Sequence, residues 1–356
     1  MRPDARPASD TVANPIANWS GVLRCPVCAT SLRSHAGGFE CEAGTHRFGI
    51  ENGIPLLFWP TGNERVDDVS QTVKAFYEET PFPNYDDLDS VGTLLAKANR
   101  SVFGRLLGEQ VPLRARVLEC GCGTGQLSNF LAVGNRTVFG TDICLNSLGL
   151  GSQFAARNHL HNVHFVQQNL FRPVFPEGYF DLVISNGVLH NTIDPHRGFQ
   201  SIARLVRPGG HLLVGLYHRY GRLITNLRRT LFKLTGDRLT FLDPNLRSTT
   251  MSEAKKRAWF MDQYRHPCES QHVIGETMRW IREIGYEFVR SIPSTRLSHR
   301  FSPSERLFQP DPPGSTLERA IIELGMISKG SKEGGFFIVI ARRPEASGAG
   351  SAARSA

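Results

Sequence analysis

The stretch Val117-Leu118-Glu119-Cys120-Gly121-Cys122-Gly123-Thr124-Gly125 decides the fold that we expect for this chain. Its pattern is typical of a buried strand that runs into a glycine-rich turn and then a helix. The glycines let the backbone bend sharply and approach a ligand closely, because no Cβ stands in the way. Glu119 places a carboxylate at the end of the strand, where a pyrophosphate would otherwise meet the helix N-terminus. The turn therefore predicts a nucleotide-type pocket that favours a cationic ligand over a phosphate.

Alternating helices and strands are expected after this turn. We expect helices over 127–133 and 195–205 and strands over 136–141, 163–167, 180–185 and 211–217, with a stop at Pro208-Gly209-Gly210. This alternation predicts an α/β fold with a doubly wound, mostly parallel sheet. Asp142 follows the second strand, where one carboxylate can hold both hydroxyls of a ribose.

Four segments together resemble a class I S-adenosylmethionine-dependent methyltransferase: 117–125, Thr141-Asp142, 180–190 and 205–210. The resemblance covers roughly residues 110–220. It implies a Rossmann-like methyltransferase fold with seven strands, the last antiparallel, for which 285–291 and 335–341 would supply strands six and seven. The implied cofactor carries a sulfonium and an amino group and no phosphate, which agrees with the acidic residue at 119.

The resemblance also implies which residues bind S-adenosylmethionine. The expected set is Glu119, Gly121, Gly123 and Gly125 for the methionine part, Asp142 for the ribose, Asn169 for the adenine amino group, and Asn186 after the fourth strand. The family usually has an aspartate where Asn169 stands, and an amide oxygen accepts from adenine without charge assistance. The alternative for Asn169 is a turn residue that ends a strand.

The segment Ser185-Asn186-Gly187-Val188-Leu189-His190 bears on the methyl acceptor. It differs from the Asn-Pro-Pro-Tyr-like sequence of enzymes that methylate planar amines. It resembles the broad small-molecule group that includes quinone-biosynthesis C-methyltransferases. That resemblance implies methyl transfer by in-line displacement to an O, N or C atom of a small molecule, with acidic molecules among the candidates. His190 is placed to act as a general base. The alternative is that it caps the strand or lines the cofactor pocket.

Cys25-Pro-Val-Cys28 and Cys41-Glu-Ala-Gly-Thr-His46 form a second constellation near the N-terminus. Three thiolates and one imidazole at this spacing predict a structural, tetrahedral zinc site. The alternative is a small β-rich module with reduced or degenerate cysteines. Residues 20–60 resemble the short zinc ribbon found beside several methyltransferases, including one that modifies ribosomal RNA guanine. A ribbon this small depends on its metal for much of its folding free energy.

The rest of the chain divides around these two parts. We expect a disordered leader over 1–19, a linker with helices that cap the cofactor pocket over 61–110, a methyltransferase domain over 111–343 and a disordered tail over 344–356. The leader lacks the apolar core of a signal peptide, and no apolar run approaches a membrane span. These features predict a cytoplasmic protein. The remaining cysteines, Cys120, Cys122, Cys144 and Cys268, fit a reducing compartment.

Two helices are expected before the first strand of the sheet, over 71–79 and 91–107. The first ends at the prolines that follow it. Tyr77, Phe82 and Tyr85 could wall the cofactor pocket, or they could serve packing alone.

Residues 218–271 are expected to form a basic lid over the pocket, since an insertion after the fifth strand lies at the carboxyl edge of the sheet. Within it, 219–257 holds ten Lys or Arg and three Asp or Glu, a net +7 against +8 for the whole chain. An apolar stripe repeats at helical spacing: Tyr220, Leu223, Ile224, Leu227, Leu231 and Leu234. The charge suits an acidic small molecule, RNA or an anionic membrane. The alternative is that the stripe packs on the core and the arginines are solvated.

Polar residues after the stripe, Asp262, Tyr264, His266 and His272, are candidates to face the acceptor. Two other functions are weighed against a small-molecule methyltransferase: an RNA methyltransferase that uses ribbon and lid, and a non-catalytic cofactor-binding or scaffold protein. A nicotinamide oxidoreductase is disfavoured for two reasons. Glu119 stands where the pyrophosphate of a dinucleotide would bind, and Gln126 stands where the dinucleotide-binding motif has its third glycine.

Overall fold

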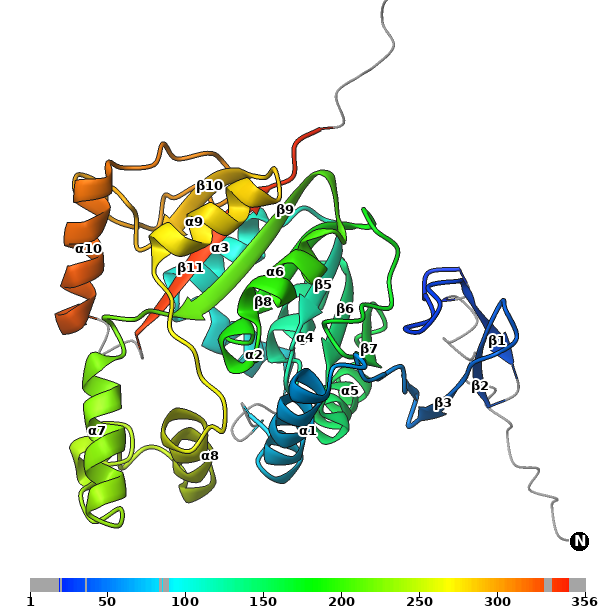
Figure 1. Cartoon of the computed structure of the whole chain (residues 1–356), viewed down its shortest axis with the longest axis horizontal. Coiled ribbons are helices and arrows are strands. Elements are labelled where there is room, and N and C mark those ends of the chain that lie inside the picture. The colour runs from blue at the N-terminus through cyan, green and yellow to red at the C-terminus, as the bar shows by residue number, and fades with distance from the viewer. Residues whose placement is uncertain are drawn as a thin grey trace, which may run out of the picture.

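The computed structural model describes residues 19, 21–35, 37–82, 85, 90–329 and 335–345. The leader expected over 1–19, apart from Trp19, and the tail beyond residue 345 lie outside the described residues. Two sheets organise the described part: a central sheet of seven strands and an N-terminal sheet of four (Figure 1).

The central sheet has the strand order β10-β11-β9-β8-β5-β6-β7. Its strands are β5 (Arg116–Cys120), β6 (Thr137–Asp142), β7 (Val163–Gln167), β8 (Phe180–Asn186), β9 (Val206–Tyr217), β10 (Glu287–Ile292) and β11 (Phe336–Arg342). Strands β5 to β9 pair in parallel, and β11 is antiparallel to both β9 and β10. The predicted seven-stranded, mostly parallel sheet is confirmed. From β5 the chain first adds β6 and β7 on one side and then β8 and β9 on the other. A crevice for a ligand lies at the carboxyl end of β5, where the order of the strands changes in this way.

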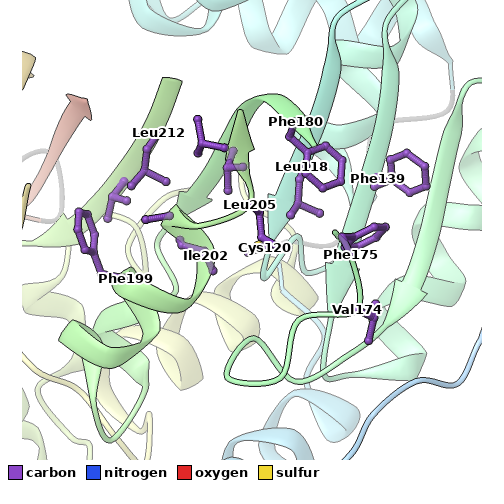
Figure 2. Close-up of a cluster of buried hydrophobic side chains, with 14 of the residues drawn as sticks. Leu118, Cys120, Phe139, Val174, Phe175, Phe180, Phe199, Ile202, Leu205 and Leu212 are labelled. Carbon is purple, nitrogen blue, oxygen red and sulfur yellow. The ribbon is translucent and has the colours of Figure 1, made fainter. Parts of the chain in front are cut away.

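Alternate residues of each strand enter different cores, as the two-residue period of a strand requires. Leu118 and Phe139 pack on one face with Phe180 and with Phe199 of α6 (Pro195–Ala203), as Figure 2 shows. Val117 packs on the other face, which is covered by α2 (Val91–Asn99), α3 (Val102–Gln110), α4 (Gln126–Val133) and α5 (Leu145–Arg157). Both faces of the sheet are therefore buried, and the strand ends remain for function.

The N-terminal sheet has the order β1-β2-β3-β4, and its neighbouring strands are antiparallel. Its strands are β1 (Leu32–His35), β2 (Gly38–Cys41), β3 (Arg47–Glu51) and β4 (Ile54–Pro55). The module is attached to the central sheet by backbone hydrogen bonds from Leu57 to Gln167 and from Arg24 to Val174. Trp19 and Phe39 belong to the same apolar cluster as Phe139. The small module is thus packed on the larger domain and shares its core.

Several predicted element boundaries are wrong. The helix expected over 91–107 is two helices, because Ser101 accepts a hydrogen bond from the amide of Gly104 and caps α3. The helix expected from residue 71 begins earlier, as α1 (Glu64–Glu79), capped by Asn63. The stop at 208–210 is absent: β9 starts at Val206 and absorbs these residues through a shift in its pairing with β8.

The lid consists of α7 (Leu223–Leu234), the 3-10 helix η3 (Thr240–Leu242) and α8 (Glu253–Tyr264), followed by α9 (Ile274–Glu283). An additional helix that the sequence did not lead us to expect, α10 (Thr316–Lys329), lies beside α9. None of the described helices combines the length and the apolar character that crossing a membrane requires.

The alternative that the apolar stripe of the lid packs on the core does not hold for three of its leucines. Leu223, Leu227 and Leu234 are exposed. The buried side of α7 carries Arg229, which is half-buried, and Phe232. The helix takes this orientation because Arg229 forms an ion pair with the buried carboxylate of Glu269 at 2.6 Å. Leaving a buried carboxylate without a cation costs more free energy than leaving leucine side chains exposed to water.

Candidate functional site

The glycine-rich turn between β5 and α4 has a left-handed backbone. The φ angle is +72° at Gly121, +53° at Gly123 and +73° at Gly125, a region that residues with a Cβ rarely adopt. A Cβ at Gly121 would lie 2.4 Å from the side chain of Val188, and one at Gly125 would lie 2.4 Å from the ring of Phe165. The turn therefore requires glycine for its conformation and, at these two positions, for its packing.

Asp142 joins the end of β6 to this turn. Its Oδ2 accepts a hydrogen bond from the amide of Gly123 at 2.8 Å, and its Oδ1 accepts one from the amide of Cys144 at 2.9 Å. Burial raises the pKa of Asp142, and the amide hydrogen bonds oppose that rise. Each carboxylate oxygen retains a lone pair. The side chain can thus accept hydrogen bonds from a diol while it holds the turn in place.

Glu119 is buried at the end of β5, where its Oε2 accepts a hydrogen bond from Ser128 at 2.5 Å. Burial raises the pKa of Glu119 to about 8, against the opposing effect of the Ser128 hydrogen bonds. In the ligand-free protein the carboxyl is therefore largely protonated at neutral pH, whereas the sequence led us to expect a fixed negative charge. A cationic amine beside it would stabilise the ionised form.

A cavity of about 680 Å³ lies at the carboxyl ends of β5, β6, β8 and β9. Helices α1, α2, α3 and α8 contribute its outer wall, and apolar side chains cover most of it, among them Val73, Phe103, Phe130, Phe171, Trp259 and Phe336. Its charged side chains are Lys97, Glu119, Asp142 and Asp262. Within the described residues, no arginine or histidine lines it. The size is that of a site for a small molecule or cofactor.

The two asparagines expected at the cofactor both line this cavity. Asn169 donates from Nδ2 to the carbonyl of Trp59 at 3.2 Å and accepts at Oδ1 from the amide of Phe171 at 3.0 Å. The second contact is that of a turn residue, yet an amide oxygen keeps another lone pair for a ligand. Asn186 stands at the end of β8, and its Oδ1 lies over Gly215, where a Cβ would come within 2.2 Å of it.

A network of polar side chains lies at one end of the cavity, where α1 meets the lid helix α8. Tyr77 donates to Oδ1 of Asp262 at 3.0 Å, and Gln263 donates to Oδ2 of Asp262 at 2.8 Å and to the hydroxyl of Tyr217 at 2.7 Å. Asn191 donates to the hydroxyl of Tyr77 at 3.3 Å, while its buried Oδ1 has no partner among the described residues. Burial raises the pKa of Asp262. This end of the cavity therefore presents oxygen atoms that can accept hydrogen bonds.

Arg222 packs against Tyr217 of this network and does not line the cavity. Its guanidinium is fully buried, lies 3.9 Å from the ring centre of Tyr217 and pairs with Glu269 at 2.7 Å. Arg229 pairs with the same carboxylate. Two of the lid's cations thus share one buried carboxylate, and neither of them lines the cavity.

His190 lies behind the cavity wall, in the 3-10 helix η2 (Leu189–Asn191). Its Nδ1 accepts a hydrogen bond from the amide of Tyr217 at 3.3 Å, and the two rings lie 4.0 Å apart. Burial lowers the pKa of His190 to about 3. The ring is therefore neutral at physiological pH, and its contacts favour the interpretation that it supports the end of β9.

Of the four polar residues after the stripe that were considered from the sequence, only Asp262 lines the cavity. Tyr264 donates to Asp243, His266 accepts from the amide of Cys268, and His272 contacts Ser270. Asn191, Tyr217 and Gln263 are among the cavity residues that sequence reasoning missed. Gln263 directly follows Asp262, but no spacing in the sequence indicates that it meets Tyr217.

The predicted zinc ligands come together at the end of the N-terminal sheet. The ligand atoms of Cys25, Cys28, Cys41 and His46 all lie within 4.8 Å of one another. Backbone amides point at two of the sulfurs: Val27 at Cys25 at 3.4 Å, and His46 at Cys41 at 3.2 Å. Such amides stabilise a thiolate, so this donor set fits a tetrahedral zinc ion.

Comparison with known proteins agrees with this geometry. Residues 118–214 match the family model described as a methyltransferase domain. The chain carries a class I S-adenosylmethionine-dependent methyltransferase domain. The match runs from β5, through the turn and Asp142, into β9, so it includes the ends of β5, β6 and β8 at the cavity but stops before Tyr217.

Individual relatives cover the chain only in part. An uncharacterised protein of Synechococcus sp. is 28% identical over 250 residues, which are 63% of this chain and 60% of that protein. The ubiquinone/menaquinone biosynthesis C-methyltransferase UbiE of Vibrio campbellii is 37% identical over 103 residues, 28% of this chain and 40% of that enzyme. The solved S-adenosylmethionine dependent methyltransferase from Mesorhizobium loti is 16% identical, with a TM-score of 0.42, and the match covers 69% of this chain and 100% of that one. The chain thus spans less than two thirds of the length of the first two relatives.

Proposed function

We propose that this protein transfers a methyl group from S-adenosylmethionine to a small, uncharged acceptor molecule. The observation that carries the proposal is the junction of Glu119, the glycine turn and Asp142 at one side of a cavity of about 680 Å³ within a methyltransferase domain. The cofactor supplies the methyl group as a sulfonium. The protein supplies binding, orientation and a dry site.

The cofactor would occupy the side of the cavity nearest β5 and β6. Glu119 is placed to take the cationic amino group, which would draw its carboxyl into the ionised form. Asp142 is placed to accept from the ribose hydroxyls. Asn169 would accept from the adenine amino group through the free lone pair of its Oδ1. Asn186, at the neighbouring strand end, would complete this side.

The acceptor would occupy the side formed by Tyr77, Asn191, Tyr217 and Asp262. Their oxygen atoms suit a molecule that donates a hydrogen bond, such as a hydroxyl or an amine, and the apolar wall suits a largely apolar body. The ionisable acid among these four residues is Asp262, and its carboxylate disfavours an anionic acceptor. Asp262, with its raised pKa, is the group best placed to take a proton from the acceptor.

The N-terminal cluster would hold one zinc ion in a structural role. All four ligands come from the protein, so no position is left for a substrate. Because the module contacts β7 and Trp59 contacts Asn169, the metal would also stabilise the adenine side of the cavity.

Calorimetric titration with S-adenosylmethionine tests the proposed cofactor. We expect saturable binding by the wild type and at least tenfold weaker binding by Asp142→Ala and by Gly123→Val. Gly149→Ala is the matched control, since a Cβ there meets nothing within 4 Å and the residue lies in α5. Absence of binding by the folded wild type would refute the proposal.

Transfer of labelled methyl into fractions of a cell extract tests the acceptor class. The proposal expects label in the neutral small-molecule or lipid fraction. Label confined to RNA would support the alternative RNA methyltransferase, and label confined to acidic metabolites would contradict the charge argument.

A further inference from the structure

Helix α7 presents a row of leucines to solvent. Leu223, Leu227 and Leu234 are 45%, 68% and 79% exposed, and their spacing places them on one side of the helix. The next element, η3, adds Phe241 and Leu242, which are also exposed. Large exposed apolar groups that recur on one helix face indicate an interaction surface.

The segment that contains this row is strongly basic. The segment 219–257 carries a net +7, and Lys233, Arg238 and Arg247 are exposed within it. Arg222 and Arg229 both pair with the buried carboxylate of Glu269. The other charged residues of 219–257 still carry a net +5. The outer side of the lid thus combines leucines with lysine and arginine, the composition of a helix that lies in the interface of an anionic bilayer.

The lid connects this outer surface to the cavity. The ring of Phe232, on the buried side of α7, lies 4.8 Å from that of Tyr264 in α8. The same α8 contributes Trp259, Asp262 and Gln263 to the cavity wall. Figure 1 shows α7 and α8 together at one end of the molecule, apart from the central sheet.

We infer that α7 docks this protein on an anionic lipid surface, with Leu223, Leu227 and Leu234 inserted among the lipids and the neighbouring lysine and arginine side chains at the headgroups. The inference goes beyond the proposed function, because it concerns the outer face of the lid and holds whatever the acceptor is. A second copy of the chain is a poorer occupant, since two surfaces of the same positive sign would repel. RNA would pair with the cations but leave the leucines in water.

Helix α10 provides an internal comparison. It also exposes a leucine row, with Leu317 at 72% and Leu324 at 53%. Its sequence contains two acidic and two basic residues, so it lacks the excess of positive charge. Substitutions in α10 therefore remove the same apolar surface without the charge pattern on which the inference rests.

Co-sedimentation of the full chain with vesicles tests the docking. The probes are vesicles of phosphatidylcholine alone and of phosphatidylcholine with roughly one third phosphatidylglycerol. We expect binding to the anionic vesicles that falls as salt is added. Leu227→Gln with Leu234→Gln should weaken it at least tenfold, because two apolar side chains lose their insertion. Lys233→Gln with Arg238→Gln should weaken binding roughly 30-fold, because each cation contributes about 1 kcal/mol near an anionic surface.

The control variant Leu317→Gln with Leu324→Gln should bind like the wild type. Equal binding to neutral and anionic vesicles, or equal weakening by the α7 and α10 leucine pairs, would overturn the inference. So would a dimer in sedimentation equilibrium that the α7 leucines hold together, or RNA binding without vesicle binding. Titration of the α7 variants with S-adenosylmethionine in solution distinguishes a failure of lipid docking from a failure of the proposed function. We expect these variants to retain the cofactor affinity of the wild type.

Discussion

Tyr77 donates a hydrogen bond to Asp262 at 3.0 Å, and this contact joins helix α1 to lid helix α8 across 185 positions of sequence. Both residues line the cavity; Asp262 is buried and Tyr77 is half-buried. The hydroxyl of Tyr77 therefore orients the carboxyl that we propose as the proton acceptor. The contact also ties the lid to the acceptor side of the cavity.

We expect Asp262→Asn to reduce methyl transfer about 100-fold or more, because an amide cannot take the acceptor's proton. Tyr77→Phe should reduce it about tenfold, since Asp262 loses one orienting hydrogen bond. Incorporation of labelled methyl into the acceptor fraction measures both. Tyr264→Phe is the control, because its hydroxyl bonds to Asp243 outside the cavity. Wild-type transfer by Asp262→Asn would exclude the proposed role.

Glu119 should make the ligand-free protein less stable as the pH rises. Its pKa is about 8 in the folded state against 4.5 for the free side chain, so the folded state binds the extra proton between these values. The unfolding free energy should therefore fall with pH in this window, by up to about 1.4 kcal/mol per pH unit from this residue. Glu119→Gln should flatten that part of the slope in urea titrations at several pH values. Parallel curves for the two proteins would contradict the prediction.

Removal of zinc should destabilise the protein. Chelation, or Cys28→Ser, should lower the melting temperature by roughly 5 °C or more, because binding of the metal is coupled to folding of the module. Metal analysis should find close to one zinc per chain. Cys268→Ser lies outside the cluster and should leave both values unchanged. Less than about half a zinc per chain would argue against the site.

Breaking the buried ion pair between Arg222 and Glu269 should be costly. Glu269→Gln leaves a buried guanidinium without its anion, and we expect a loss of about 3–5 kcal/mol of unfolding free energy. Arg222→Met together with Glu269→Gln should recover part of it. The Arg222 and Arg229 guanidiniums overcome burial and lower the pKa of Glu269 to about 2. The pair's contribution is thus present above about pH 4.5 and lost as the pH falls toward 2.

Glu42→Gln is the matched control for this pair, because it breaks the exposed pair with Arg33. Solvent screens such a pair, so its loss should cost less than about 1 kcal/mol. Equal effects of Glu42→Gln and Glu269→Gln in denaturant titrations would show that burial does not determine the strength of the inner pair.

The parts of the site that the sequence indicated are those that a single βα unit builds. Glu119, Gly121 and Gly123 sit in one turn, and Asp142 ends the next strand, so their proximity follows from the βαβ unit. The four zinc ligands were likewise visible as two short pairs. In each case, contacts between neighbouring segments bring the residues together, and local patterns in the sequence report such contacts.

The acceptor side could not be read in this way. Tyr77, Asn191, Tyr217 and Asp262 come from four separate elements, and only the packed lid brings them together. His190 seemed to face the acceptor because it follows a strand end, yet η2 turns it behind Tyr217.

The sequence by itself thus determined the parallel sheet, the glycine turn with its acidic partners, the cysteine cluster and the positive charge of the lid. Only the tertiary structure decided which side of α7 faces inward. A hydrophobic pattern predicts that leucines are buried, but Glu269, 40 positions beyond Arg229, holds that arginine inside and leaves Leu227 and Leu234 exposed. The energy of a buried carboxylate depends on a partner distant in sequence, and no periodicity along one helix can report it.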